Sequence, residues 1–114
     1  MNRWDIPVWL EQDVLERDRR CVYCRVAFLP DAPTRERRSW EHIVNDANLV
    51  TLENIALCCR GCNASKGAKD LGVWLESEYC KRRDITCFTV APIVQAALAK
   101  SASSTAMVPV LRCS

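Results

Sequence analysis

Apolar residues recur at the spacing of one helix face near the start of the chain. Those that share this face are Ile6, Trp9, Leu10, Val14 and Leu15. Asp5 can cap such a helix, and Pro7 suits its first turn, where a missing backbone N–H breaks no hydrogen bond. We therefore predict an amphipathic helix over residues 6–17 whose apolar side packs against the core.

The middle of the chain alternates short apolar runs with polar turns. Residues 39–44 and 55–58 have the length and apolar character of strands, and a polar loop around residues 45–48 separates them. A short helix over residues 63–66 follows, and Gly67 can end it. The expected order is strand, loop, strand, helix.

Two more helices are expected after this unit. Asp70 can cap a helix over residues 70–83, and Thr89 can cap a last helix over residues 90–100 that has Pro92 in its first turn. The first of these helices has an apolar stripe formed by Leu71, Trp74, Leu75 and Tyr79. Residues 101–106 turn small and polar, which predicts a flexible linker, and the closing run at 107–111 is too short to form a domain. We therefore expect residues 101–114 to be a flexible tail. Helices around a short sheet make the expected fold class α+β.

The length of the chain leaves room for one domain. We place it at residues 1–100 of the 114, with its central unit at about 21–69. A domain of this size buries a modest core, so a bound metal ion is expected to stabilise it. The N-terminus lacks the basic start and long apolar run of a signal peptide, and no stretch is apolar enough to cross a membrane. A reducing, cytoplasmic compartment is therefore expected.

Four of the eight cysteines form two pairs of identical spacing. Cys21 and Cys24, like Cys59 and Cys62, are separated by two residues, which is the spacing of a tight turn that presents two thiolates to one metal ion. In a reducing compartment such pairs are more typical of zinc sites than of disulfides. We predict one structural zinc held by all four, with Gly61 allowing the second turn. The remaining cysteines are expected to be small buried residues: Cys58, Cys80, Cys87 and Cys113.

Basic residues gather around the two cysteine pairs, although the formal net charge is only +2. Residues 17–38 hold seven basic and three acidic side chains, a local charge of +4. Arg60, Lys66 and Lys69 follow with no acid between them. By themselves such runs are equally typical of an ordinary solvated surface. Their position beside the cysteine pairs favours a surface that binds nucleic acid.

Together these motifs resemble the HNH endonuclease family, whose catalytic unit is the ββα-metal finger, here in its zinc-stapled, four-cysteine form. The resemblance covers residues 21–67. It rests on an acid-histidine pair, an asparagine before the second strand, and a second asparagine directly after the last cysteine. These residues are Glu41-His42, Asn54 and Asn63, and the ending Cys62-Asn63-x-x-Lys66-Gly67 is also typical of the family.

The resemblance implies a metal-dependent endonuclease that hydrolyses DNA phosphodiester bonds and leaves 5′-phosphate and 3′-hydroxyl ends. His42, the one histidine of the chain, would be the general base that activates water. Glu41 and Asn63 supply hard oxygen ligands, so they would hold one catalytic Mg²⁺ or Mn²⁺. Asn54 would order the loop rather than touch the substrate. The side chains expected to contact DNA phosphates are Arg37, Arg38, Arg60, Lys66 and Lys69.

Glu41 departs from the family, in which the acid before the histidine is most often Asp. Glutamate is one methylene longer but supplies the same kind of oxygen ligand. Neighbouring residues of a regular strand point to opposite faces, so Glu41 and His42 can share one site only where the strand ends or twists. The resemblance implies such an irregularity.

Two other functions are open on the sequence. The first is a zinc-stabilised nucleic-acid-binding module that derives from an HNH nuclease and no longer cuts, which Glu41 leaves possible. The second is a zinc-stabilised protein-interaction domain, which the basic runs beside the cysteines disfavour.

Overall fold

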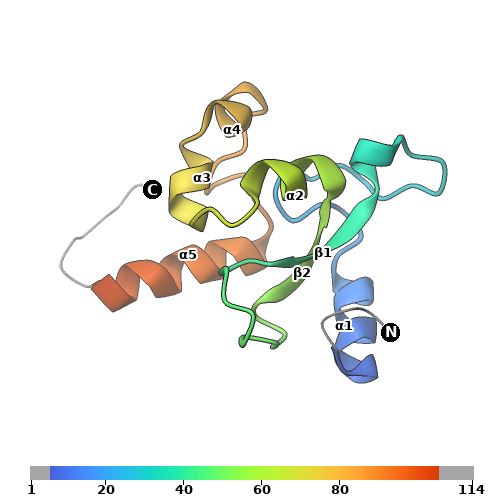
Figure 1. Cartoon of the computed structure of the whole chain (residues 1–114), viewed down its shortest axis with the longest axis horizontal. Helices are drawn as coiled ribbons and strands as arrows, with labels where there is room; N and C mark the ends of the chain where they lie inside the picture. The colour runs from blue at the N-terminus through green and yellow to red at the C-terminus, as the bar shows by residue number, and fades with distance from the viewer. Residues whose placement is uncertain (1–5, 106–114) are drawn as a thin grey trace.

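Two short strands lie at the centre of the protein, whose computed structural model describes residues 6–105 (Figure 1). β1 (Arg38–His42) and β2 (Ile55–Cys59) pair antiparallel, with Trp40 opposite Leu57. α2 (Arg60–Lys66) continues directly from β2 and packs on both strands, and the short 3₁₀ helix η1 (Thr34–Glu36) leads into β1. The α+β class and the order strand, loop, strand, helix are as the sequence predicts.

β2 is buried along its whole length because helices cover both of its faces. On one face, Ala56 and Cys58 pack in a cluster with Tyr23 and Trp74. On the other face, Ile55 and Leu57 form a second cluster, which includes the N-terminal helix. A strand that is apolar on both faces is typical of this kind of burial, since its side chains alternate between two cores.

α1 (Val8–Arg17) contributes buried apolar side chains to the second cluster. The residues with i+4 spacing, Ile6, Leu10 and Val14, are buried as predicted. The expectation that Trp9 belongs to the core is wrong, because it is 59% exposed. Consecutive helix residues are rotated by about 100°, so Trp9 lies outside the narrow stripe that meets β2. The expected cap at Asp5 lies outside the described residues.

The end of α1 is fastened to β2 by polar contacts. Arg17 donates from Nη1 to the carbonyl oxygen of Leu52 at 2.7 Å and from Nη2 to that of Ile55 at 2.8 Å. Its Nε lies 2.7 Å from the Asp18 carboxylate, which in turn accepts the backbone N–H of Leu57 at 3.0 Å. Arg17 is thus committed to the fold rather than available to a ligand.

The helix expected over residues 70–83 is two helices, α3 (Leu71–Leu75) and α4 (Glu78–Arg82). Asp70 caps the first as predicted, its side chain accepting from Val73 N at 3.2 Å. Ser77 then caps the second by accepting from Cys80 N at 3.3 Å. A cap residue has non-helical backbone angles, so Ser77 ends any continuous helix at this point.

α5 (Pro92–Thr105) is longer than predicted. Thr89 does not cap it, because the Thr89 hydroxyl accepts from Thr86 N at 2.8 Å in the preceding turn. The helix passes through residues 101–105, which the sequence assigned to a flexible tail, since alanine and serine are compatible with a helix that has already begun. Residues 106–114 lie outside the described part. Within residues 6–105, no helix has the length and apolar character needed to cross a membrane.

Candidate functional site

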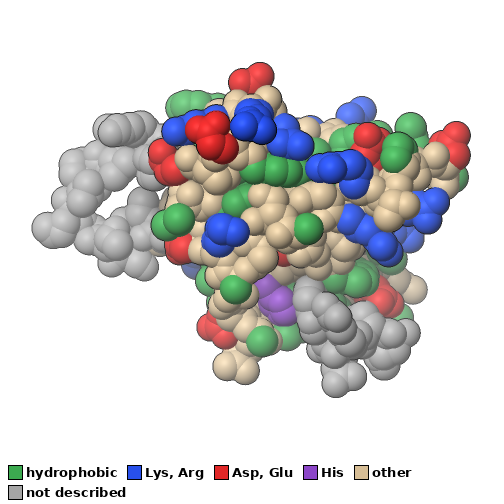
Figure 2. All heavy atoms as spheres, turned by 45° about the horizontal axis from the view of Figure 1, so that its top comes forward, with side chains coloured by type: hydrophobic (Ala, Val, Ile, Leu, Met, Phe, Trp, Pro, Cys, Tyr) green, Lys and Arg blue, Asp and Glu red, His purple; other side chains and the backbone are tan. Residues whose placement is uncertain are grey.

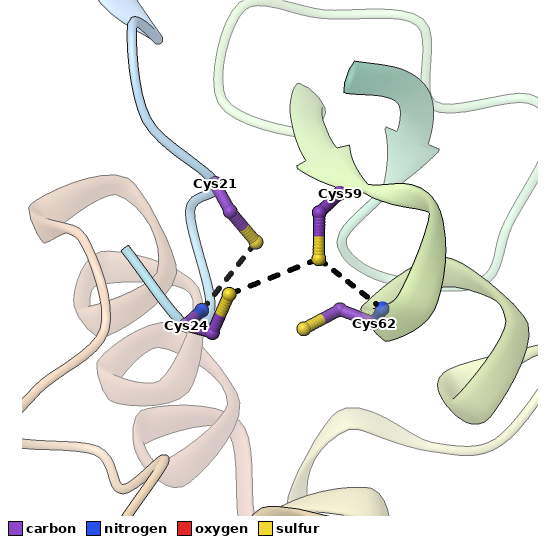
Figure 3. Close-up of side chains that lie close together, drawn as sticks. All are labelled: Cys21, Cys24, Cys59 and Cys62. Carbon is purple, nitrogen blue, oxygen red and sulfur yellow. Dashed lines mark hydrogen bonds between the residues drawn. The ribbon is translucent and has the colours of Figure 1, made fainter. Parts of the chain in front are cut away.

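The four paired cysteines meet at one point (Figure 3), where their side chains turn toward one another. Their sulfur atoms all lie within 4.8 Å of one another, and Cys24 Sγ is 3.7 Å from Cys59 Sγ. Four sulfurs placed about 2.3 Å from a zinc ion at the corners of a tetrahedron are about 3.8 Å apart. The arrangement therefore fits a zinc ion, and the predicted grouping of these four residues is confirmed.

Each cysteine pair is shaped by its own backbone. Tyr23 N and Cys24 N donate to Cys21 Sγ at 3.3 and 3.4 Å, and Cys62 N donates to Cys59 Sγ at 3.4 Å. The last contact also caps α2, so one cysteine serves both the helix and the metal site. Backbone N–H groups aimed at sulfur favour the thiolate form that zinc requires.

Because the four sulfur atoms lie close together, the pKa values of the cysteines shift in opposite directions. Hydrogen bonding, first with Cys21, lowers the pKa of Cys24 to about 7 and also lowers the pKa of Cys59. Hydrogen bonding with the same residue raises the pKa of Cys62. Without a cation the four cannot all be thiolates, and a divalent ion removes this conflict because it neutralises the charge of the sulfurs.

The glycine of the second pair has a role different from the predicted one. Among the described glycines only Gly67, at the end of α2, has a positive φ. A Cβ atom at Gly61 would lie 3.1 Å from Arg35 Nη2 and 3.3 Å from Tyr79 Oη. Gly61 therefore allows two side chains to approach the metal site closely, rather than allowing an unusual backbone turn.

Tyr79 and Arg83 form a cover beside the metal site that the sequence did not indicate. Tyr79 Oη donates to Cys62 Sγ at 3.4 Å, and the guanidinium carbon of Arg83 lies 3.7 Å from the centre of the Tyr79 ring. Burial raises the pKa of Tyr79, so its hydroxyl keeps its proton as a donor. The sequence signal for this contact was the four-residue spacing of Tyr79 and Arg83, which places two side chains on one face of a helix.

Glu41 lies in the interior, in a polar cluster with two partners. Its Oε2 accepts the Tyr23 hydroxyl at 2.6 Å and the Lys66 ammonium at 2.9 Å. Lys66 is only 1% exposed and its Nζ also lies 3.4 Å from the carbonyl oxygen of His42. Burial, followed by the nearby Glu41 charge, raises the pKa of Tyr23 well above its usual range. The expectation that Lys66 holds a phosphate is incompatible with this position.

His42 lies on the opposite face of β1 from Glu41. The two strands pair one to one through His42, so the expected irregularity at this pair is absent. Trp40 packs in the cluster of α1, and His42 shares its face by the alternation of the strand. The purple histidine of Figure 2 reaches the surface. Partial burial lowers the pKa of His42 below 6.5, against the opposing effect of Glu41.

Asn54 and Asn63 both hold the backbone around β1. Asn54 accepts Val44 N at 2.7 Å and donates to the carbonyl oxygens of Val44 and Leu49, each at 3.1 Å. Asn63 Nδ2 donates to Ser39 Oγ at 2.9 Å and to the Trp40 carbonyl oxygen at 3.1 Å. The expected loop-ordering role of Asn54 agrees with these contacts.

The predicted ligands of a catalytic ion are not assembled into a divalent-ion site. The carboxylate of Glu41 already binds an ammonium group and a phenol, and the amide of Asn63 is bonded to β1. A Mg²⁺ site uses carboxylate oxygens that carry uncompensated charge. The donor set therefore does not fit a divalent ion while Lys66 is paired with Glu41.

The other basic residues expected to contact DNA are exposed. These are Arg37, Arg38, Arg60 and Lys69. Figure 2 shows Lys and Arg side chains spread over the face that carries η1, α2 and α4. Arg35 and Arg83, which the sequence did not single out, approach this face at Gly61 and Tyr79. The structure thus brings basic residues from three segments to the side of the cysteine site.

Comparisons with known proteins give no significant match. No protein-family model matches the chain, and neither a curated protein nor a solved structure matches it significantly.

Proposed function

We propose that this protein is a zinc-stapled endonuclease of the HNH type, which hydrolyses DNA phosphodiester bonds with Mg²⁺ or Mn²⁺ as cofactor. The observation that carries the proposal is the β1–β2–α2 unit clamped by four converging cysteines. On this unit His42 ends β1, Asn54 orders the intervening loop and Asn63 joins α2 to β1. The same order of elements and residues underlies the resemblance to the family.

His42 is the general base of this proposal. Its lowered pKa keeps the imidazole neutral near neutral pH, and only the neutral ring can take a proton from water. Exposed arginine and lysine side chains beside the cysteine site would hold the phosphate backbone. We place the protein in the reducing cytoplasm, where the thiols of the cysteine site stay available to zinc.

Plasmid cleavage tests the proposal. Zinc-loaded protein incubated with supercoiled plasmid and Mg²⁺ or Mn²⁺ should produce nicked or linear DNA, and His42→Ala should lower the rate by about 100-fold or more. Asn48→Ala, an exposed loop change, is the matched control and should cut like the parent. The catalytic assignment is wrong if His42→Ala cuts as fast as the parent.

A second function, a DNA-binding module without cleavage, is favoured by one observation. The Glu41 carboxylate is neutralised by Lys66 inside the protein, where a catalytic acid would need to bind an ion. A parent that binds DNA but cuts nothing with any divalent ion, together with an active Glu41→Asp variant, would support this alternative.

A further inference from the structure

The inference concerns Arg25, which directly follows Cys24 in the first cysteine turn. Its φ is 69°, in the left-handed region, where the Cβ atom of an L-residue crowds the following carbonyl oxygen. Among the described residues, the others with a positive φ are Gly67 and Asp84, and glycine and aspartate enter this region more readily than arginine does. Arginine at this position therefore lowers the stability of the fold relative to glycine.

The cysteine turn explains this backbone conformation but not the choice of residue. Cys21 N donates to the Val26 carbonyl oxygen at 2.9 Å, and Arg25 N donates to the Cys21 carbonyl oxygen at 3.0 Å. These bonds close the chain around the two sulfurs, and residue 25 takes its positive φ within this turn. Glycine would meet the same requirement without strain, so the turn itself gives no reason for an arginine side chain.

The Arg25 side chain has no polar partner in the described part of the chain. Within residues 6–105 the hydrogen bonds of Arg25 are made by its backbone, including its carbonyl oxygen, which accepts Arg20 Nη1 at 3.1 Å. The ion pairs of the same residues do not include its guanidinium. Arg17 is the contrast, since its guanidinium is bonded to Asp18 and to β2. The Arg25 guanidinium is therefore available to a ligand.

Arg60 occupies the equivalent place after the facing cysteine. Cys24 Sγ and Cys59 Sγ lie 3.7 Å apart (Figure 3), and Arg25 and Arg60 directly follow these two cysteines. The cysteine cluster therefore holds the backbones of the two arginines at a fixed spacing. Arg60 is exposed, and its side chain also takes part in none of the ion pairs within residues 6–105. Two guanidinium groups on one support, neither neutralised by an ion pair, suit the regularly spaced phosphates of a nucleic-acid strand.

We propose that Arg25 is a substrate-binding residue whose guanidinium binds one backbone phosphate of DNA while Arg60 binds a neighbouring phosphate. The proposal rests on the proposed function for the identity of the ligand, but its test measures binding and does not require cleavage. Loss of the Arg25 side chain should therefore weaken DNA binding and stabilise the free protein at the same time. A solvated arginine would leave binding unchanged, and an arginine that packs into the fold would give the opposite change in stability.

Binding of a fluorescent DNA duplex to the zinc-loaded protein, without other divalent ions, tests the proposal. The variants are Arg25→Gly, which removes both charge and strain, and Arg25→Lys, which keeps the charge at the same backbone angle. Lys100→Ala, an exposed change on α5, is the control for loss of one charge, and Asp84→Gly is the control for relief of a positive φ. Fluorescence anisotropy at several salt concentrations measures affinity, circular dichroism measures the unfolding temperature, and elemental analysis measures the zinc content of every sample.

Arg25→Gly should bind DNA about tenfold more weakly at low salt and reduce the slope of log affinity against log salt by about one. Its unfolding temperature should rise by about 2 to 5 °C, because glycine adopts a positive φ freely. Arg25→Lys should keep the slope, and Lys100→Ala should bind like the parent. Asp84→Gly should raise the unfolding temperature less than Arg25→Gly does, because aspartate tolerates the left-handed region. Adding Arg60→Ala to Arg25→Gly should reduce the slope by about two.

Three results overturn the inference: Arg25→Gly that binds DNA like the parent, Arg25→Lys that loses as much affinity as Arg25→Gly, or fully zinc-loaded Arg25→Gly that unfolds at a lower temperature than the parent. Plasmid cleavage by the same samples with Mg²⁺ separates this failure from failure of the proposed function. Weaker DNA binding by Arg25→Gly, with no cleavage by the parent, would sustain the inference and contradict the nuclease. Cleavage by a parent whose Arg25→Gly variant binds DNA unchanged would do the reverse. A parent that binds no duplex DNA would overturn both.

Discussion

Adjacent side chains of β1 have opposite environments. Glu41 points into the cluster with Tyr23 and Lys66, whereas His42 lies on the face shared with Trp40. The alternation of a strand is enough to produce this difference. It separates a buried, neutralised acid from a half-buried imidazole whose pKa is lowered, first by burial.

Tyr79 contacts one of the four clustered cysteines and would act on a bound metal ion through that cysteine. Its hydroxyl donates to Cys62 Sγ at 3.4 Å, and a donor of this kind holds a ligating sulfur in position. Tyr79→Phe should therefore release zinc to a chelator about tenfold faster than the parent while the fold is retained. The colour change of a zinc indicator measures the release.

Phe88→Leu, a change at an exposed aromatic ring, is the control for this comparison. Equal release rates for Tyr79→Phe and Phe88→Leu would show that the Tyr79 hydroxyl does not hold the sulfur.

At the scale of elements, the loop between the strands depends on one buried side chain. Asn54 is 4% exposed and spans the loop from Val44 to Leu49 with three hydrogen bonds of 2.7 to 3.1 Å. These bonds help to fix the end of β1, where Ile43, directly after His42, is also fully buried in the larger apolar cluster.

Asn54→Ala should lower the free energy of unfolding by about 2 to 3 kcal/mol, because it removes three hydrogen bonds made by a buried side chain. Asn45→Ala removes one exposed 3.4 Å contact and should cost less than about 0.5 kcal/mol. Urea unfolding of both variants measures the difference. A cost for Asn54→Ala as small as that for Asn45→Ala would mean that the loop is not held in this way.

Elements with a periodic pattern or a fixed spacing could be predicted from the sequence. The apolar stripe of α1, both strands and the four converging cysteines belong to this class, because local geometry determines them. The break at Ser77 could not be predicted, because it depends on competition between a continuous helix and a capping side chain. The burial of Lys66 could not be predicted either, because it depends on a partner distant in sequence. Lysine is normally exposed, so only its pairing with Glu41 explains its position.

At the scale of the whole molecule, the cysteine site joins the segment after α1 to the junction of β2 and α2 (Figure 3). Cys21, Cys59 and Cys62 themselves belong to the larger apolar cluster, together with Tyr23 and Trp74. A small domain gains much of its stability from such a link, because metal binding is coupled to folding.

Removal of zinc should therefore lower the unfolding temperature by more than about 10 °C. Circular dichroism after dialysis against a strong chelator and a reducing agent measures the effect, and added ZnCl₂ should restore the parent curve. Elemental analysis before dialysis should give one zinc per chain. A chain that keeps its unfolding temperature without zinc would show that the four sulfurs do not stabilise the fold.

If the protein binds DNA as proposed, we expect the binding to depend on the basic face as a whole. Affinity for duplex DNA should fall steeply with salt, and Arg38→Ala and Arg60→Ala should each reduce the slope of log affinity against log salt by about one. Lys100→Ala, at an exposed position on α5, is the control and should leave the slope unchanged. Fluorescence anisotropy at several salt concentrations measures the slope. Binding that is insensitive to salt would show that these arginines do not contact the DNA phosphates.

The direct junction of β2 and α2 restricts how the chain can change in length. Cys59 is the last residue of β2, the cap of α2 and a member of the cysteine cluster, and no loop separates the two elements. One inserted residue at this junction would turn α2 by about 100° and shift it by about 1.5 Å, which would carry Asn63 and Lys66 away from β1. Insertions are tolerable instead in the exposed turn at residues 45–49, so divergent descendants of this sequence should vary in length there and keep residues 55–66 at constant spacing.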